Sequence, residues 1–347
     1  MTPLAPGSVS LRLYPHDLSA NDQVEVLRRQ ARRASEIGYD GVMVSEHHAD
    51  FPGYLPNPVQ LAGLLLDAMP TGWVAPCPML LPLKPYALIA EDLAWLAAAY
   101  PGRVGVGFAA GALPVDFELA EVPFDEIVDR FKTALPKIID ALRGHDPGPL
   151  GTDRAIRRLA DDPMPILVAA QSAPACRRAA RLGCGVLYDS LQSSEVSARL
   201  GAAHREAGAE TGRVLIRRVW IGPPPEAEMA AQMDHYRSYA NEAATKNWTD
   251  DSLVHGDTPA AAAEALLAVL ALRLRHRQCS RARQRTHARA GRRSAHSTRR
   301  RFCRRSPGGT RRLTPQTSAP STLAMAASSS TSSANASSET STLRAFV

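Results

Sequence analysis

The stretch YDGVMVSEHHADFPGYLPNPVQLAGLLLDAM, residues 39–69, decides the fold class. Its first part, YDGVMV, is a short apolar run with β-branched residues, which is typical of a buried strand. Its last part, residues 57–69, has Pro58 where a first helical turn accepts proline, and is rich in apolar residues at helical spacing. A strand that passes through a loop into a helix is one βα unit of a parallel sheet.

The same alternation continues on both sides of this stretch. The predicted strands are residues 8–15, 39–46, 72–82, 102–111, 164–172, 184–190 and 212–222, and the last two predicted helices are residues 225–244 and 257–274. This many strands favours an α/β fold of the (β/α)8 TIM-barrel type over an open doubly wound sheet, which usually ends after about five or six strands.

Residues 273–347 differ in composition from the rest of the chain. They contain 17 arginines, no lysine and the single acid Glu339, so they carry +16, and residues 1–272 must carry −9 to give the total of +7. The arginine-rich part passes into a Ser/Thr/Ala-rich end with too little apolar surface to offset the entropy of ordering. We therefore expect a barrel domain at 1–272 and a disordered tail at 273–347.

The tail offers no apolar run after residue 274, so the sequence predicts a barrel that is incomplete at its eighth strand. The first and seventh strands would then lack a neighbour at the seam, which exposes edges that invite aggregation. Many arginines without lysine are also what a GC-rich gene yields when it is read out of frame. We hypothesise a frameshift near Leu272; an uninterrupted frame in DNA from independent isolates would contradict it.

The cysteines and the N-terminus bear on the compartment. The chain has five cysteines, an odd number, and no C-x-x-C pair, which argues against a disulfide framework and a zinc ribbon. The N-terminus lacks the pattern of a signal peptide. No apolar run approaches the length of about 18 residues that crosses a bilayer. We therefore expect a cytoplasmic protein that does not span a membrane.

Glu46, His47 and His48 lie where the strand at residues 39–46 ends. Chemistry in an α/β barrel is carried by residues at the C-terminal ends of the strands. One imidazole there could accept a proton or bind a cofactor. Adjacent histidines on an extended segment point to opposite sides, so one metal site could rarely use both. We expect one functional histidine and no metal; the alternative is a solvated strand end.

Three further strand ends offer candidate residues. Cys77-Pro78 is a candidate cis peptide, because proline is poorly tolerated inside a strand, although most X-Pro bonds are trans. The glycine-rich run GVGFAAG contains Ala109 and Ala110 but no phosphate-binding motif. Ser172 precedes a helix whose N-terminal N–H groups suit an anion, although an ordinary N-cap serine is commoner.

Together, four segments resemble the bacterial luciferase-like flavin monooxygenases over residues 8–272. They are EHH with its loop and PNP, APCPMLLPLKPYALIAEDLAWL, GRVGVGFAAGALPVDFELAEVP and PILVAAQSAPACRRAARLGCGVL. The resemblance implies that His47 faces a reduced flavin and that Cys77-Pro78 is cis beneath the isoalloxazine ring. It also implies that Ser172, with Gln171 and N–H groups near Ala175, holds the flavin phosphate.

One position departs from the family. Where bacterial luciferase has an arginine on the flavin phosphate after the fourth strand, this chain has Ala110, beside Ala109. If the phosphate affinity is to be kept, Arg177 or Arg178 would have to supply the missing charge.

The resemblance implies a monooxygenase that uses reduced FMN and dioxygen on a small organic substrate. A separate flavin reductase would supply the reduced cofactor, and members of the family commonly form homodimers. A deazaflavin-dependent dehydrogenase or reductase of the same superfamily is the alternative. Two more remote readings are an inactive truncated barrel and a nucleic-acid binder that uses the arginine-rich tail. The lack of lysine and of interleaved aromatics argues against nucleic acid.

Overall fold

The βα units that the sequence predicts are present in the structure, a computed structural model that describes residues 1–15, 17–145, 148–239, 245, 248, 253–270 and 345–346. All of these residues belong to one compact unit, Met1–Gln278 with Arg344–Val347. The tail predicted at 273–347 therefore lies outside the described residues, apart from 345–346.

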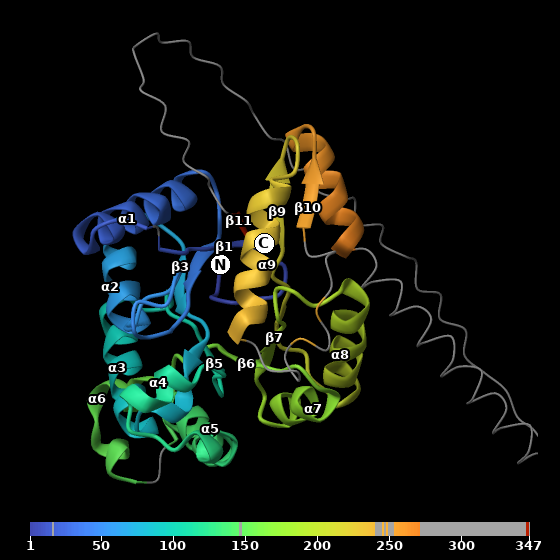
Figure 1. Cartoon of the computed structure of the whole chain (residues 1–347). Coiled ribbons are helices and arrows are strands. Elements are labelled where there is room, and N and C mark those ends of the chain that lie inside the picture. Colours follow the sequence, from blue (N-terminus) through green and yellow to red (C-terminus); the bar gives the residue numbers. More distant parts are fainter. Residues whose placement is uncertain are drawn as a thin grey trace, which may run out of the picture. The chain divides into compact units, whose positions relative to one another are not determined.

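Parallel strands form the centre of this unit (Figure 1). The strands are β1 (Ser10–Arg12), β2 (Gly41–Val44), β3 (Trp73–Pro76), β4 (Met79–Leu80), β5 (Val106–Ala109), β6 (Ile166–Ala169), β7 (Gly185–Leu187), β8 (Arg213–Val214), β9 (Arg218–Ile221), β10 (Leu253–Gly256) and β11 (Ala345–Phe346). One sheet has the order β1-β2-β3, a second the order β4-β5-β6-β7-β8 and a third the order β10-β9-β11, in which β11 runs antiparallel to β9. A parallel bridge between Val74 and Val104 continues the first sheet into the second.

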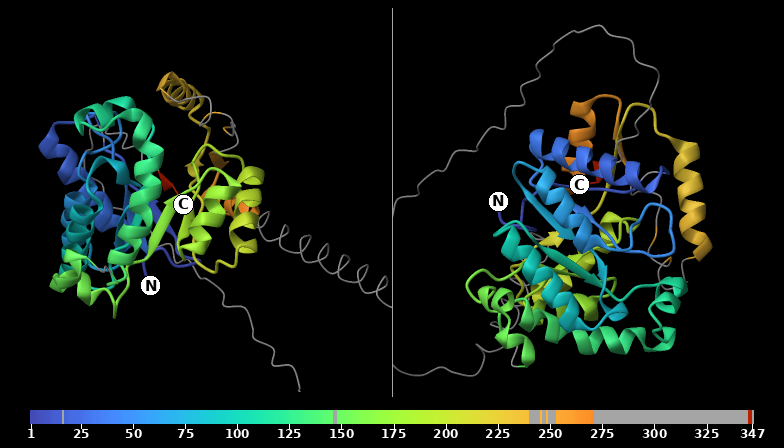
Figure 2. Two further views of the ribbon diagram at one scale, coloured as in Figure 1. Left: turned by 90° about the horizontal axis from the view of Figure 1, so that it is seen from below. Right: turned by 90° about the vertical axis from the view of Figure 1, so that its left-hand side faces the viewer.

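Helices follow the strands and lie outside them, with α1 to α6 on one side and α7 and α8 on the other (Figure 2). The helices are α1 (Ala20–Glu36), α2 (Pro58–Ala68), α3 (Tyr86–Ala99), α4 (Pro114–Leu119), α5 (Ile127–Ala141), α6 (Arg154–Arg158), α7 (Ala173–Arg181), α8 (Ser194–Glu206) and α9 (Glu226–Tyr239), with short 3-10 helices η1 (Leu81–Leu83), η2 (Phe124–Glu126) and η3 (Pro149–Thr152). Residues 259–270 are also helical. In the described part of the chain, no helix is both long and apolar enough to span a bilayer.

Side chains of the strands alternate between two apolar clusters, one on each face of the sheet. Val42, Val44 and Val74 belong to the large cluster that also contains the buried faces of the helices. Met43 lies between Val42 and Val44 in sequence, and Ala75 follows Val74. Met43 and Ala75 are opposite each other in register and belong to a small cluster on the inner face. Period-two alternation therefore separates an outer core from a barrel interior.

The eighth strand is the main correction to the sequence-based prediction. β10 pairs in parallel with β9, from Leu253 opposite Arg218 to Gly256 opposite Ile221. The expectation that the seventh strand has no neighbour was therefore wrong. The run LVHG is only four residues long, so it gives almost no periodic signal beside the helical pattern that follows it. Among the described residues, β1 forms a ladder with β2 alone, so the seam between β10 and β1 is not closed by hydrogen bonds there.

Two predicted strands differ in detail from the observed ones. The strand predicted at 72–82 is divided into β3 and β4, and the peptide between them, Cys77-Pro78, is cis as predicted. The strand predicted at 212–222 is divided into β8 and β9. A proline inside a helix usually bends or breaks it, but α5 continues through Pro136.

Candidate active site

The imidazole of His47 is held by a buried carboxylate at the C-terminal end of β2. His47 Nδ1 lies 2.8 Å from Asp116 Oδ2, and the other oxygen of Asp116 accepts the backbone N–H of His48 at 2.8 Å. Asp116 has no exposed surface, whereas the His47 side chain is 19% exposed. A carboxylate at Nδ1 fixes the ring orientation and leaves Nε2 as the ring atom that can meet a ligand.

Glu46 and His48, on either side of His47, make contacts of their own at the end of β2. The Glu46 carboxylate accepts the backbone N–H of Leu80 at 2.7 Å, and this bond ties the end of β2 to β4. His48 Nε2 lies 3.4 Å from Glu46 Oε1, so the His48 ring turns toward Glu46 and away from the pairing of His47 with Asp116. The two histidine side chains therefore have different partners. The residues that the structure describes include no group of three His, Cys, Asp or Glu side chains that could hold a metal ion.

Aromatic side chains surround the exposed edge of His47. Its ring centre lies 5.1 Å from that of Phe51 and 4.5 Å from that of Tyr54, both in the loop after β2. Tyr54 stands edge-on to Tyr14, which follows β1, at 5.6 Å. Hydrogen bonds join the side chains of Tyr14 and Tyr54, and those of Tyr54 and Tyr236 on α9. The three phenols thus link the ends of β1 and β2 to α9.

The phenols of Tyr14 and Tyr54 are uncharged at neutral pH. Burial raises the pKa of Tyr14, and burial raises the pKa of Tyr54 well above its ordinary value of 10.0. Because the charged form is disfavoured in a site without water, each hydroxyl remains a hydrogen-bond donor. The wall beside His47 is therefore aromatic but not anionic.

Cys77 lies inside the barrel and is fully buried. Burial raises the pKa of its thiol to about 12, so the sulfur is not a thiolate nucleophile at neutral pH. Its Sγ occupies the place where a side chain on Gly107 of β5 would begin, which leaves that position no room for a Cβ. Ala109 and Ala110, at the end of β5, are half-buried and pack against the cluster of Leu80 and Phe117.

Ser172 is the N-cap of α7, as the sequence predicts. Its Oγ accepts the backbone N–H of Ala175 at 3.3 Å, and Pro174 has no N–H, so the donors left at this helix start are the Ser172 hydroxyl and the N–H of Ala173. Gln171 lies at the same strand end, but its amide donates to Asp189 Oδ2 at 3.2 Å. Gln171 and Ser172 are both exposed.

Several residues that the structure brings to these strand ends were not predicted from the sequence. Asp116 belongs to α4, a helix of six residues that was not predicted. The sequence pattern that could have indicated this short helix is Pro114 followed by Asp116, just after the glycine-rich strand. Tyr14, Tyr54 and Tyr236 are distant in sequence, and only the fold brings them together.

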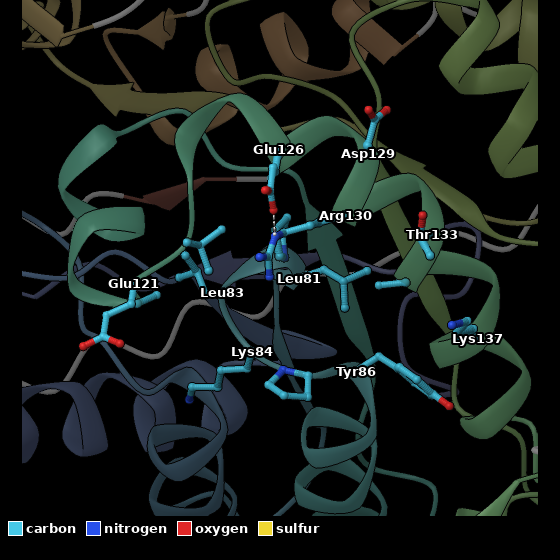
Figure 3. A pocket seen from close by; sticks show the side chains of 15 residues that line it. Leu81, Leu83, Lys84, Tyr86, Glu121, Glu126, Asp129, Arg130, Thr133 and Lys137 are labelled. Carbon is cyan, nitrogen blue, oxygen red and sulfur yellow. Dashed lines mark hydrogen bonds and ion pairs between the residues drawn. The ribbon is translucent and has the colours of Figure 1, made fainter.

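A cavity of about 660 Å³ lies between η1, the start of α3 and one face of α5 (Figure 3). Its wall carries Lys84, Lys137 and the ion pair of Arg130 with Glu126, whose closest atoms are 2.9 Å apart. None of the residues predicted for the site lines this cavity. It is therefore distinct from the site around His47.

Comparison with known proteins finds relatives in sequence and in fold. The chain is 33% identical over 86 residues to 3,6-diketocamphane 1,6-monooxygenase of Pseudomonas putida; this segment is 25% of the chain and only 23% of that protein. The crystal structure of monooxygenase RslO1 from Streptomyces bottropensis superposes with a TM-score of 0.60 and 23% identity over 76% of this chain and 88% of that one.

A second solved structure is the oxygenating constituent of 3,6-diketocamphane monooxygenase from the CAM plasmid of Pseudomonas putida, in complex with FMN. It superposes with a TM-score of 0.53 and 19% identity over 65% of this chain and 71% of that one. At these identities the two structures establish the fold alone. The sequence profile of luciferase-like monooxygenases, however, matches residues 9–305, most of the chain. The chain therefore belongs to the luciferase-like monooxygenase family.

Proposed function

We propose that this chain is a flavin-dependent monooxygenase that acts on a small organic molecule with reduced FMN and dioxygen. The observation that carries the proposal is the pairing of His47 with the buried Asp116 at the end of β2, in a member of this family. A separate flavin reductase would deliver the reduced cofactor. When bound, the flavin supplies the activation of dioxygen, so the protein has to bind it, exclude water and hold a proton.

The described residues fit a flavin at both of its ends. The half-buried, uncharged side chains of Tyr14 and Tyr54 offer the apolar surface that an aromatic ring system requires. At the other end, the Ser172 hydroxyl and the N–H of Ala173 can donate to phosphate oxygens at the start of α7. We assign the ring to the surface over Cys77-Pro78 and the strand end at Ala109 and Ala110.

A negative charge, the carboxylate of Asp189, lies near the proposed phosphate site and would repel a phosphate. Asp189 lies beside the proposed phosphate site through its bond to Gln171, but its carboxylate also accepts the backbone N–H of Leu191 at 2.8 Å and Trp248 Nε1 at 3.0 Å. Donors of this kind offset part of its negative charge. Arg177 and Arg178 on α7 are the nearest cations in sequence, and they stand in for the arginine that Ala110 replaces.

His47 is the group that we assign to proton transfer. Asp116 accepts the proton on Nδ1, so in the neutral ring Nε2 is the acceptor that is left for a ligand. A base at this place can take a proton from the substrate or return one to the leaving oxygen.

Anaerobic titration of the purified protein with reduced FMN, oxidised FMN and a reduced deazaflavin tests the proposal. We expect reduced FMN to bind in the micromolar range and the loaded protein to consume dioxygen. Binding of the deazaflavin without binding of FMN would replace the proposal by the dehydrogenase or reductase alternative. Binding of neither cofactor would overturn both.

A further inference from the structure

Arg12 is a buried cation in the interior of the barrel. It is the last residue of β1, it is only 8% exposed, and its partner in register is Met43, whose side chain belongs to the inner cluster. Its Nη2 donates to Ser45 Oγ, and its guanidinium carbon lies 5.4 Å from the centre of the Tyr14 ring. In the described part of the chain, Arg12 Nε is buried without a hydrogen-bond partner.

The charge of Arg12 is not neutralised by its surroundings. The side chains with the largest electrostatic effect on Arg12 are those of Tyr14, Tyr54, Cys77 and Tyr236, and none of the four is a carboxylate. Burial raises the pKa of Tyr14, Tyr54 and Cys77, so these three are neutral at pH 7. No carboxylate among the described residues forms an ion pair with Arg12. An unpaired buried charge is costly to keep unless a ligand supplies the counter-charge.

A second guanidinium strengthens the positive potential at the same place. Arg218 of β9 is 6% exposed, and its guanidinium carbon lies 6.0 Å from the centre of the Tyr236 ring. Its charge also acts on Tyr14. Two guanidinium groups close to aromatic rings produce a field that attracts anions, because the surrounding protein screens charge less than bulk water does.

We propose that Arg12 binds a planar, delocalised anion at the inner end of the site beside His47. A guanidinium presents paired N–H donors that match two neighbouring acceptors on one anion, which a single point charge cannot do. Two sources share this chemistry: the anionic pyrimidine ring of the reduced flavin, and the carboxylate of a substrate. The first source rests on the proposed function, whereas the second does not.

Arg12→Met is the decisive variant, because it keeps an unbranched side chain that can replace most of the arginine stem, and it removes the charge. The probes are reduced FMN against oxidised FMN, and benzoate against the neutral benzamide. If the flavin is the anion, Arg12→Met binds reduced FMN about ten- to a hundredfold more weakly and oxidised FMN almost unchanged. If the substrate is the anion, the loss falls on benzoate and spares benzamide. Arg12→Lys keeps the charge but lacks the paired N–H donors of a guanidinium. Its affinity for the anion should therefore lie between that of the parent and that of Arg12→Met.

The stability of the apo protein separates a ligand-binding role from a structural one. Replacing an unpaired buried charge by an apolar side chain is neutral or stabilising, so apo Arg12→Met should melt at or above the temperature of the parent. A lower melting temperature would mean that Arg12 supports the fold, and this result overturns the proposal. Arg12→Gln repeats the comparison with a second uncharged side chain, and the same two outcomes decide it.

Equal affinity of Arg12→Met and the parent for reduced FMN and for benzoate also overturns the proposal. So does a parent protein that binds none of these anions. A parent that binds no flavin but binds benzoate through Arg12 refutes the proposed function and leaves the anion site standing. The two failures are therefore distinguishable in one set of titrations.

Discussion

His47 and Asp116 lie 69 residues apart in the chain, and their side chains meet at 2.8 Å at the end of β2. The pairing depends on α4, which begins after the glycine-rich end of β5 and brings a carboxylate without exposed surface to the imidazole. The same carboxylate fixes the backbone at His48. One buried acid therefore sets both the orientation of the ring and the path of the chain that carries it.

His47→Ala should lower turnover about 10²- to 10⁴-fold and leave the fold intact, because it removes a positioned acid-base group from the surface of the site. Steady-state oxygen uptake and the circular dichroism spectrum check the two parts. His48→Ala is the matched control, since it keeps the backbone N–H that Asp116 accepts. Equal activity of His47→Ala and the parent would end the assignment of His47.

Asp116→Asn should lower kcat about ten- to a hundredfold and change KM little, because a charge-assisted hydrogen bond that orients the ring is lost. Asp116 acts through His47, so it is a positioning residue. In a His47→Ala background, Asp116→Asn should have almost no further effect on kcat. Fully additive losses would show that the two side chains act independently.

Ser172→Asp should weaken FMN binding and leave riboflavin binding unchanged, because only FMN carries the phosphate that a second negative group would repel. Stability should hardly change, since Asp is also a good N-cap. Ser172→Asn, a neutral cap of the same size, is the control in fluorescence titrations. If Ser172→Asp binds FMN as tightly as Ser172→Asn does, the phosphate lies elsewhere.

Stability should fall as the pH rises from about 9 toward 12. Burial raises the pKa of Cys77 from 9.0 to about 12, and the pKa values of Tyr14 and Tyr54 are raised in the same direction. In this window the unfolded chain loses protons that the folded chain retains, so ionisation favours unfolding. Urea denaturation across the window measures the slope. Cys77→Ala should make the slope shallower, and an unchanged slope would contradict the buried neutral thiol.

Val254→Ala should destabilise the protein by about 2 kcal/mol, because Val254 of β10 is buried opposite Val219 of β9. His255→Ala, which alters the exposed neighbour on the same strand, should have little effect. Urea denaturation of the two variants compares them. If both variants are as stable as the parent, β10 contributes nothing to the barrel.

The sequence predicted the long elements well and the contacts between them poorly. Residues 39–69 carry a strand, an N-cap and a helical period in one stretch, so β2 and α2 could be recognised without the fold. β10 was missed because four residues hold too little pattern. Asp116 and the three phenols were missed because their roles depend on neighbours that only the tertiary structure supplies. Arg12 was visible in the sequence, but its lack of a counter-charge was not.

The contact between Cys77 and Gly107 restricts the order in which this barrel can change by mutation. A side chain at position 107 needs the space that the sulfur at position 77 now fills. Gly107→Ala alone should therefore be rejected, while Cys77→Gly followed by Gly107→Ala exchanges one small volume for another. The order of the two substitutions therefore matters: the side chain at position 77 must become smaller before a larger residue fits at position 107. Libraries that randomise the two positions together should recover only combinations that keep their summed size nearly constant.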